Sequence, residues 1–469
     1  MNNKYKYLVK DTIIFAFGSL GSKVILFFLV PLYTNFLTTE EYGTADLVST
    51  FTQLLVPFSA VVVNQAMIRF GMKKTENTED VAKASFVVLL FSVFITLALT
   101  PIVGLYGPIS HWKWYLAVQV ILTNFSEVER AYLKVKNRNR TFAIISILQT
   151  LILAFANIIL LTILHTGVQG YLVANILALL FASIVAFFAA GLQHDLRIGQ
   201  FRVLLTKKML AYSFPLIFSN VSWWVIHSSD KIMIEWMIGV SALGIYTAAT
   251  KIPSLINVFM SVFNQAWGLS SIREIESTDD TSFCVSVFNI FCVVLFGASI
   301  LFTTIIKPFM SIYVGEAFRE AWQYTPLLLA AAVFYSVSAF IGSIYAALQR
   351  TTNDMWTSVL CAVINVVVNY IGICIVGTWG AIIGTLTAYF VTAILRLIDI
   401  RRHMKFNIDF FRFGLNIVLM LVHGLLVSIN WHILFVSIIT LLLFGFFNRQ
   451  TLGFLGKKLD VLIFSKKGR

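Results

Sequence analysis

The stretch Ser228–Lys251, SSDKIMIEWMIGVSALGIYTAATK, places charged residues inside or beside an apolar run. They are Asp230, Lys231, Glu235 and Lys251. An apolar run of about 18 or more residues is typical of a membrane-spanning helix. Ionisable side chains within such helices are costly unless they face a cavity or a partner. The stretch therefore predicts a membrane protein that keeps a charged, hydrated interior.

Composition extends this prediction to the whole chain. Of 469 residues, 58% are hydrophobic and 12% are charged, and the mean hydropathy is +0.85. Soluble proteins carry about 25% charged residues. A transmembrane β-barrel would show short alternating segments instead of long apolar runs. We therefore predict an all-α, polytopic membrane protein. Its net charge of +13 lies around apolar runs, so we expect no nucleic-acid partner.

The apolar runs predict fourteen membrane spans, with both termini in the cytoplasm. The spans are 12–37, 44–68, 84–106, 112–132, 141–164, 169–190, 209–238, 241–268, 283–306, 322–348, 355–376, 379–399, 412–429 and 431–447. Most of the 35 Lys and Arg residues fall on one side of these spans. The other side has only Lys113, Lys307 and Arg319. Because basic residues favour cytoplasmic loops, this asymmetry sets the orientation.

The two halves of the chain echo each other. NQA occurs at 64–66 and again at 264–266, and GxxG turns occur at 167–170 and 377–380. Six spans separate equivalent points, which predicts a parallel repeat with the substrate site between the halves and alternating access by rocking. The expected parts are an N-lobe (1–190, spans 1–6), an amphipathic cytoplasmic linker (191–208), a C-lobe (209–400, spans 7–12), and spans 13–14 with a basic amphipathic tail (401–469).

Several kinds of site are missing from the sequence. It has no GxxxxGK[ST] phosphate-binding loop and no HExxH or other metal spacing among its seven His residues. Its four cysteines lie in apolar segments without a CxxC pair. We therefore expect no enzyme activity, no cofactor and no metal, and we expect any transport to be driven by a proton or sodium gradient or by downstream consumption of the product.

Short motifs give the chain a family resemblance. They are LTTEEYGTADL at 37–47, DKIMI…G…ALGIYTAATKI at 230–252 and the basic loop KNRNR at 136–140. With the fourteen-span layout, the chain resembles the polysaccharide transporters of the multidrug/oligosaccharidyl-lipid/polysaccharide (MOP) exporter superfamily. Family members with these features are flippases of polyprenyl (undecaprenyl) diphosphate-linked oligosaccharide repeat units. They act in the assembly of O-antigen, capsule or exopolysaccharide.

The resemblance also implies partners and a location. The partners would be the lipid-linked oligosaccharide, membrane lipids, and the polysaccharide polymerase and glycosyltransferases of the same pathway. The location would be the bacterial cytoplasmic (inner or plasma) membrane, crossed many times. The superfamily also contains cation-coupled drug exporters and flippases of lipid-linked peptidoglycan precursors.

A diphosphate needs cations in the cavity that carries it, and Lys and Arg both bind phosphate. The sequence offers Lys23, Arg69, Lys231 and Lys251 as diphosphate-binding residues. The first three have alternative roles. Lys23 could pair with a carboxylate, Arg69 could be a cytoplasmic anchor, and Lys231 could pair with Glu235 four residues later or snorkel outward.

Further polar residues within spans could line the cavity or couple transport to a cation. They are Asp46, Asn64, Gln65, Glu127, Asp230, Asn264 and Gln265. Asp46 could instead begin a solvated helix, Glu127 could pair with Arg130, and the amides could bond between helices. Asp230 could orient a phosphate or carry a coupling proton.

These residues favour a flippase that moves a lipid-linked oligosaccharide from the cytoplasmic to the outer leaflet. Alternatives of the same fold are a cation-coupled drug or metabolite antiporter and a peptidoglycan-precursor flippase. A membrane polymerase or ligase is a different class, but it would need a sizeable outer loop. The longest one here, 307–321, is small.

Overall fold

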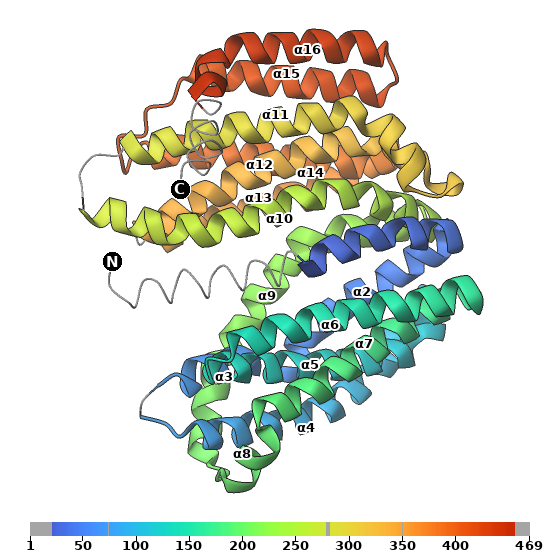
Figure 1. Cartoon of the computed structure of the whole chain (residues 1–469), viewed down its shortest axis with the longest axis vertical. Helices are drawn as coiled ribbons and strands as arrows, with labels where there is room; N and C mark the ends of the chain where they lie inside the picture. The colour runs from blue at the N-terminus through green and yellow to red at the C-terminus, as the bar shows by residue number, and fades with distance from the viewer. Residues whose placement is uncertain (1–20, 74, 278–281, 349, 455–469) are drawn as a thin grey trace, which may run out of the picture. The chain divides into compact units, whose positions relative to one another are not determined.

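The computed structural model describes residues 21–454 except 74, 278–281 and 349, and this part of the chain forms helices without strands (Figure 1). The predicted all-α class is confirmed. Every predicted span overlaps a helix, although residues 12–20 of the first span lie outside the described residues.

Unit 1 and unit 2 are the two compact groups into which the chain divides. Unit 1 comprises Met1–Thr247 and Gly315–Phe318, and unit 2 comprises Ala248–Val314 and Arg319–Arg469. In unit 1 the helices are Gly21–Phe36, α2 (Thr39–Ala60), α3 (Val63–Gly71), α4 (Thr78–Val103), α5 (Lys113–Val135), α6 (Asn139–Asn157), α7 (Gly167–Ala190), α8 (Leu192–Ile198), α9 (Val203–Met237) and the start of α10 (Val240–Ser277). Short helical turns are η1 (Gly107–Trp112), η2 (Ile158–Ile163) and η3 (Glu316–Phe318).

Unit 2 contains the rest of α10 and the last six helices. These are α11 (Ser282–Tyr313), α12 (Ala321–Ala347), α13 (Thr351–Val376), α14 (Thr378–Ile400), α15 (Phe410–Ser428) and α16 (Ile433–Phe447). Stacked aromatic rings form part of its core. The ring centroids of Trp267 and Phe340 lie 4.8 Å apart, and the Trp267 indole N–H donates to Ser343 Oγ at 2.9 Å.

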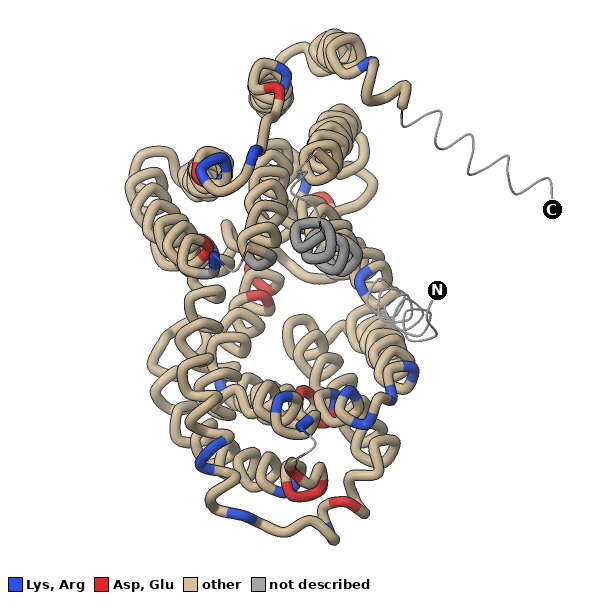
Figure 2. Tube along the Cα trace, turned by 90° about the vertical axis from the view of Figure 1, so that its left-hand side faces the viewer, with Lys and Arg blue, Asp and Glu red and all other residues tan. Residues whose placement is uncertain are grey.

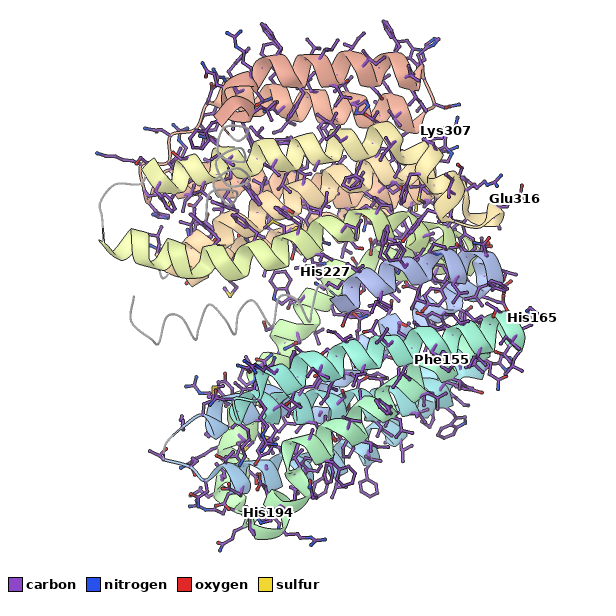
Figure 3. All side chains as sticks on the ribbon, in the orientation of Figure 1. Phe155, His165, His194, His227, Lys307 and Glu316 are labelled. Carbon is purple, nitrogen blue, oxygen red and sulfur yellow. The ribbon has the colours of Figure 1, made fainter. Side chains whose placement is uncertain are left out.

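Length and composition qualify nine helices of the described chain as membrane spans, and the bent pair α2–α3 makes a tenth. Large apolar side chains are exposed along them, including Phe94 at 70% and Phe155 at 67% (Phe155 is labelled in Figure 3). Such extensive apolar surface fits contact with lipid. The protein is therefore a multi-pass membrane protein. The number fourteen, the predicted lobe boundaries and the cytoplasmic termini remain predictions.

Unit 1 has an apolar core beside one end of its helices. Met67 of α3, Leu89 of α4, Tyr132 of α5, Ala186 of α7 and Met209 of α9 are all buried there. Figure 2 looks onto the end of unit 1 where α3 and α8 lie, and charged residues gather there at helix ends and connecting segments. The helices are thus packed by apolar side chains and bordered by polar ones.

A tyrosine–aspartate pair recurs in the two units. In unit 1 the Tyr132 hydroxyl on α5 donates to Asp195 of α8 at 2.5 Å, and Lys136 lies 3.1 Å from the same carboxylate. In unit 2 the Tyr345 hydroxyl on α12 donates to Asp399 of α14 at 2.7 Å. The two tyrosines lie six predicted spans apart, as a parallel repeat would place them. Burial would raise the pKa of Asp195, but the hydrogen bonds from Tyr132 and Lys136 hold it below its usual value.

A backbone break separates α2 from α3. Val61 and Val62 have φ angles of 52° and 53°, and the two helices meet at a bend of 53°. Left-handed backbone is strained for β-branched residues. The freed Val62 carbonyl accepts hydrogen bonds from the Gln65 amide at 3.1 Å and from Ser213 Oγ at 3.4 Å. Non-helical backbone at membrane depth is tolerated where it is buried in protein or lines a cavity.

The break can be tested by glycine substitution. Val62 and Val63 are adjacent and both buried, but only Val62 has a left-handed backbone. Relief of that strain should make Val62→Gly less destabilising than Val63→Gly by about 1–2 kcal/mol. Thermal unfolding of the two purified variants in the same detergent measures the difference. Equal loss of stability would contradict a strained break.

Candidate functional site

A polar pocket of about 470 Å³ lies within unit 1, beside the break between α2 and α3. Its size falls in the range of small-molecule sites. Helices α2, α3, α5, α7 and α9 line it. The polar lining residues are Ser49, Thr52, Gln53, Asn64, Gln119, Thr123, Asn124, Glu127, Asn175, Asn220, Trp223, Trp224, His227 and Ser228. The backbone break thus borders a cavity.

Helical periodicity brings these side chains to one face. On α5, Gln119, Thr123 and Glu127 are spaced four residues apart, which aligns them along one stripe. On α9, Asn220, Trp223 and His227 follow at intervals of three and four. This polar periodicity within apolar spans is the signal that could have revealed the pocket. The sequence analysis selected only Glu127 and Asn64 from it.

Hydrogen bonds hold the pocket side chains in place. Asn64 Nδ2 donates to Glu127 Oε2 at 2.8 Å, and Asn124 Nδ2 donates to Ser59 Oγ at 2.8 Å. The Trp224 indole N–H donates to the Thr50 carbonyl at 2.8 Å. Side chains fixed by such partners are preorganised for a ligand. One carboxylate oxygen of Glu127 thus accepts from Asn64. Arg130, the partner that the sequence analysis offered for Glu127, donates to Gln149.

An aromatic pair forms part of the pocket wall. The rings of Trp223 and His227 stack with centroids 5.8 Å apart and an interplanar angle of 14°. Both residues belong to α9, and Figure 3 labels His227 along this helix. Trp223 is 45% exposed, so part of its side chain is accessible. The pocket thus combines an aromatic surface with amide and hydroxyl groups.

The predicted cations lie elsewhere in the described structure. The lining of this pocket contains Glu127 but neither lysine nor arginine. Lys23 is partly buried on the helix Gly21–Phe36, and Lys251 is partly buried on α10 in unit 2. Arg69 is exposed at the end of α3, with its guanidinium 4.6 Å from the Tyr212 ring centroid. The roles of these cations in substrate binding stay predictions.

Lys231 belongs to a second cluster. Its ammonium lies 2.9 Å from Asp46 of α2, and Thr247 Oγ1 donates to the same carboxylate at 3.1 Å. Beside them, the Tyr246 hydroxyl and the Lys231 amide both donate to Asp230. The alternative in which Asp46 begins a solvated helix is wrong. Asp46 lies within α2, which begins at Thr39, and its side chain is only 12% exposed. The alternative pairing of Lys231 with Glu235 is replaced by the pairing with Asp46.

Two glycines bring the helices of this cluster together. A Cβ on Gly43 would lie 2.1 Å from the Val240 carbonyl oxygen, and one on Gly244 would lie 2.0 Å from the Thr39 carbonyl oxygen. Side chains at either position would force α2 away from the start of α10. The segments around Gly43 and Gly244 thus pack against one another within unit 1.

The remaining predicted amides differ in position. Asn64 lines the pocket, whereas Gln65 is exposed. The side chains of Asn264 and Gln265 lie outside the described residues, although their backbone belongs to α10. Among the predicted polar residues, the structure therefore brings Asn64 together with Glu127, and Asp46 together with Asp230.

Sequence reasoning missed a buried arginine in unit 2. Arg396 of α14 is 5% exposed, and its guanidinium lies 2.7 Å from the Asp354 carboxylate. It also donates to Thr357 Oγ1 at 3.0 Å and to the Ser338 carbonyl at 2.9 Å. The sequence analysis counted it only among the residues that set orientation. A buried guanidinium that donates to several neighbouring groups typically holds helices together.

Comparison with known proteins identifies the family. The family model described as "Polysaccharide biosynthesis protein" matches residues 8–267, more than half of the 469 residues. The chain belongs to the polysaccharide biosynthesis protein family. The match confirms the predicted resemblance to a polysaccharide family, and the solved structures described next share the fold.

Two curated relatives come from Haemophilus influenzae. An uncharacterized membrane protein is 24% identical over 272 residues, which cover 55% of this chain and 64% of the relative. An Lsg locus protein is 21% identical over 266 residues, with the same coverage of 55% and 64%. The matches therefore span less than two thirds of either relative.

Solved structures share the fold of this family member. The lipid II flippase MurJ in an inward closed conformation has a TM-score of 0.69 at 13% identity, covering 94% of this chain and 100% of that one. An inward-facing multidrug resistance MATE family transporter of the MOP superfamily has a TM-score of 0.59 at 15% identity, covering 84% and 94%. At these identities the likeness establishes the fold alone.

The Asp46–Lys231 pair can be tested by a double-mutant cycle. Lys231→Ala leaves a mostly buried carboxylate without its cation, so it should lower the free energy of unfolding by about 3 kcal/mol. Asp46→Asn combined with Lys231→Met should recover most of this loss. Thermal unfolding in detergent measures both, with the exposed Lys208→Ala as the control. A double variant no more stable than Lys231→Ala would contradict the pairing.

Proposed function

We propose that this protein is a flippase for polyprenyl (undecaprenyl) diphosphate-linked oligosaccharide repeat units in the bacterial cytoplasmic membrane. It would move them from the inner to the outer leaflet for surface polysaccharide synthesis. The observation that carries the proposal is the amide-rich pocket inside a helical unit of a polysaccharide biosynthesis family member. A sugar head group must leave water to cross a membrane, and such a pocket supplies hydrogen bonds in its place.

Alternating access would carry the substrate across. Transporters with parallel repeats open a central site to each side in turn. The pathway's glycosyltransferases would supply the lipid-linked unit, and its polymerase would consume it outside. A proton or sodium gradient would drive the cycle, and Glu127 is the pocket carboxylate that could take up the cation. The protein would thus act as a transporter and not as an enzyme.

One observation favours a second function, a cation-coupled drug or metabolite antiporter. Glu127 and the exposed face of Trp223 line one pocket, and carboxylates and aromatic faces both attract organic cations. MATE transporters share the fold. Efflux of a cationic dye from cells that express the protein, abolished by Glu127→Gln, would establish this alternative.

Depletion and complementation test the flippase directly. Loss of the protein should abolish the surface polysaccharide and leave its lipid-linked unit in the inner leaflet, and the wild-type gene should restore export. Proteoliposomes loaded with the extracted lipid-linked unit should show protein-dependent flipping. Normal surface polysaccharide in depleted cells, with no accumulated intermediate, would refute the proposal.

The intramembrane lysines provide a graded test of transport. Lys23→Ala and Lys251→Ala should each reduce flipping more than Lys251→Arg does, because arginine retains the positive charge for a diphosphate. The measurement is the flipping rate in proteoliposomes at equal protein content. Equal rates for all three variants would remove both lysines from substrate binding.

A further inference from the structure

We infer that the pocket of unit 1 is a sugar subsite and that the diphosphate of the same substrate binds outside it. This inference rests on the proposed flippase function and assigns one part of the substrate to one set of residues. Its basis is the chemistry of the lining, which supplies neutral hydrogen-bonding groups, an aromatic face and one carboxylate.

Charge excludes the diphosphate from this pocket. Protein sites for phosphate use Arg, Lys and helix N-termini. Neither Arg nor Lys occurs among the described residues that line the pocket, whereas Glu127 does. The N-terminus of α3 also borders the pocket, but Asn64 there already binds the Glu127 carboxylate. A carboxylate repels a phosphate strongly where the surroundings are apolar. The anionic part of the substrate must therefore bind among cations elsewhere.

Amide and hydroxyl groups suit the sugar. Each sugar hydroxyl both donates and accepts a hydrogen bond, and the side chains of Asn and Gln do the same. Gln53, Gln119, Asn175 and Asn220 supply such groups from four different stretches around the cavity. The Glu127 carboxylate can accept further sugar hydroxyls, while Asn64 holds it in position.

The aromatic pair supplies the remaining contact. A pyranose ring has an apolar face of C–H bonds, and the electron-rich face of an indole attracts such polarised hydrogens. Trp223 is 45% exposed, and its stacking on His227 fixes the orientation of the indole. Polar groups surround this flat surface from α2, α5 and α7. This arrangement matches the edges and the face of a sugar ring.

The pocket volume sets the size of the group it can take. At about 470 Å³ it falls within the range of pockets for drug-sized ligands. One or two sugar rings are of this size, whereas a complete repeat unit with its lipid is larger. The subsite thus recognises one or two sugars of the glycan, and it would contribute to the choice of substrate.

Paired lipid probes test the subsite. The full-length protein in nanodiscs is titrated with farnesyl diphosphate and with farnesyl diphosphate carrying N-acetylglucosamine, and affinities are read by microscale thermophoresis. The wild type should prefer the sugar-bearing probe by about tenfold, a typical gain for a few added contacts. Trp223→Ala and Asn220→Leu should each reduce the preference to about twofold or less without changing affinity for the bare diphosphate.

Trp236→Ala is the matched control. Trp236 lies on the same helix, is 68% exposed and is absent from the pocket lining, so its loss should leave the preference intact. Thermal unfolding confirms that each variant is folded. Loss of preference in both pocket variants but not in the control supports the subsite.

Other outcomes overturn the inference in distinguishable ways. The subsite is refuted if the wild type does not prefer the sugar-bearing probe, or if the pocket variants retain that preference. Flipping in proteoliposomes would in that case still support the proposed flippase function. Displacement of the sugar-bearing probe by tetraphenylphosphonium, lost in Glu127→Gln, assigns the pocket to cations instead. Sugar preference without any flipping refutes the proposed transport and leaves a sugar-binding pocket.

Discussion

The cost of a polar group in hydrocarbon governs this structure. A charged or amide side chain inside a membrane must find a partner or a hydrated cavity. In unit 1, Lys231 meets Asp46, Glu129 accepts from Ser183 Oγ at 2.6 Å, and Asn64 donates to Glu127. In unit 2, Arg396 donates to residues of two neighbouring helices, α12 and α13. These partners decide which helices lie side by side, because apolar packing alone is non-directional.

The same requirement explains the pocket. The break at Val61 and Val62 exposes backbone that lipid cannot solvate, so it must lie against protein or a cavity. Ser213 satisfies part of it, and the polar lining of the pocket surrounds the rest. A strained turn of this kind persists only where the surrounding structure holds it. The break, the amides and the aromatic pair therefore belong to one site.

The two clusters of unit 1 divide the chemistry. The pocket carries neutral and acidic groups, whereas the Asp46–Lys231 cluster balances its charges internally. Gly43 and Gly244 allow this cluster to form by close backbone approach. Charge-balanced contacts of this kind stabilise the packing of neighbouring helices. The pocket and the contact between α2 and the start of α10 thus use different residues within one unit.

The all-α class, the approximate positions of the helices and the family could be predicted from the sequence, which also singled out Asn64 and Glu127 as candidate residues. Hydropathy and helical periodicity are local properties, so they can be read along the chain. The three-dimensional structure was needed to show that Lys231 pairs with Asp46, that Arg396 is buried, and that Gln119, Asn175 and Trp223 line one cavity with Glu127. Those facts depend on how separate helices rotate and pack against each other. A lysine within an apolar run is the same in sequence whether it meets a carboxylate or a substrate, and only its three-dimensional neighbours distinguish the two.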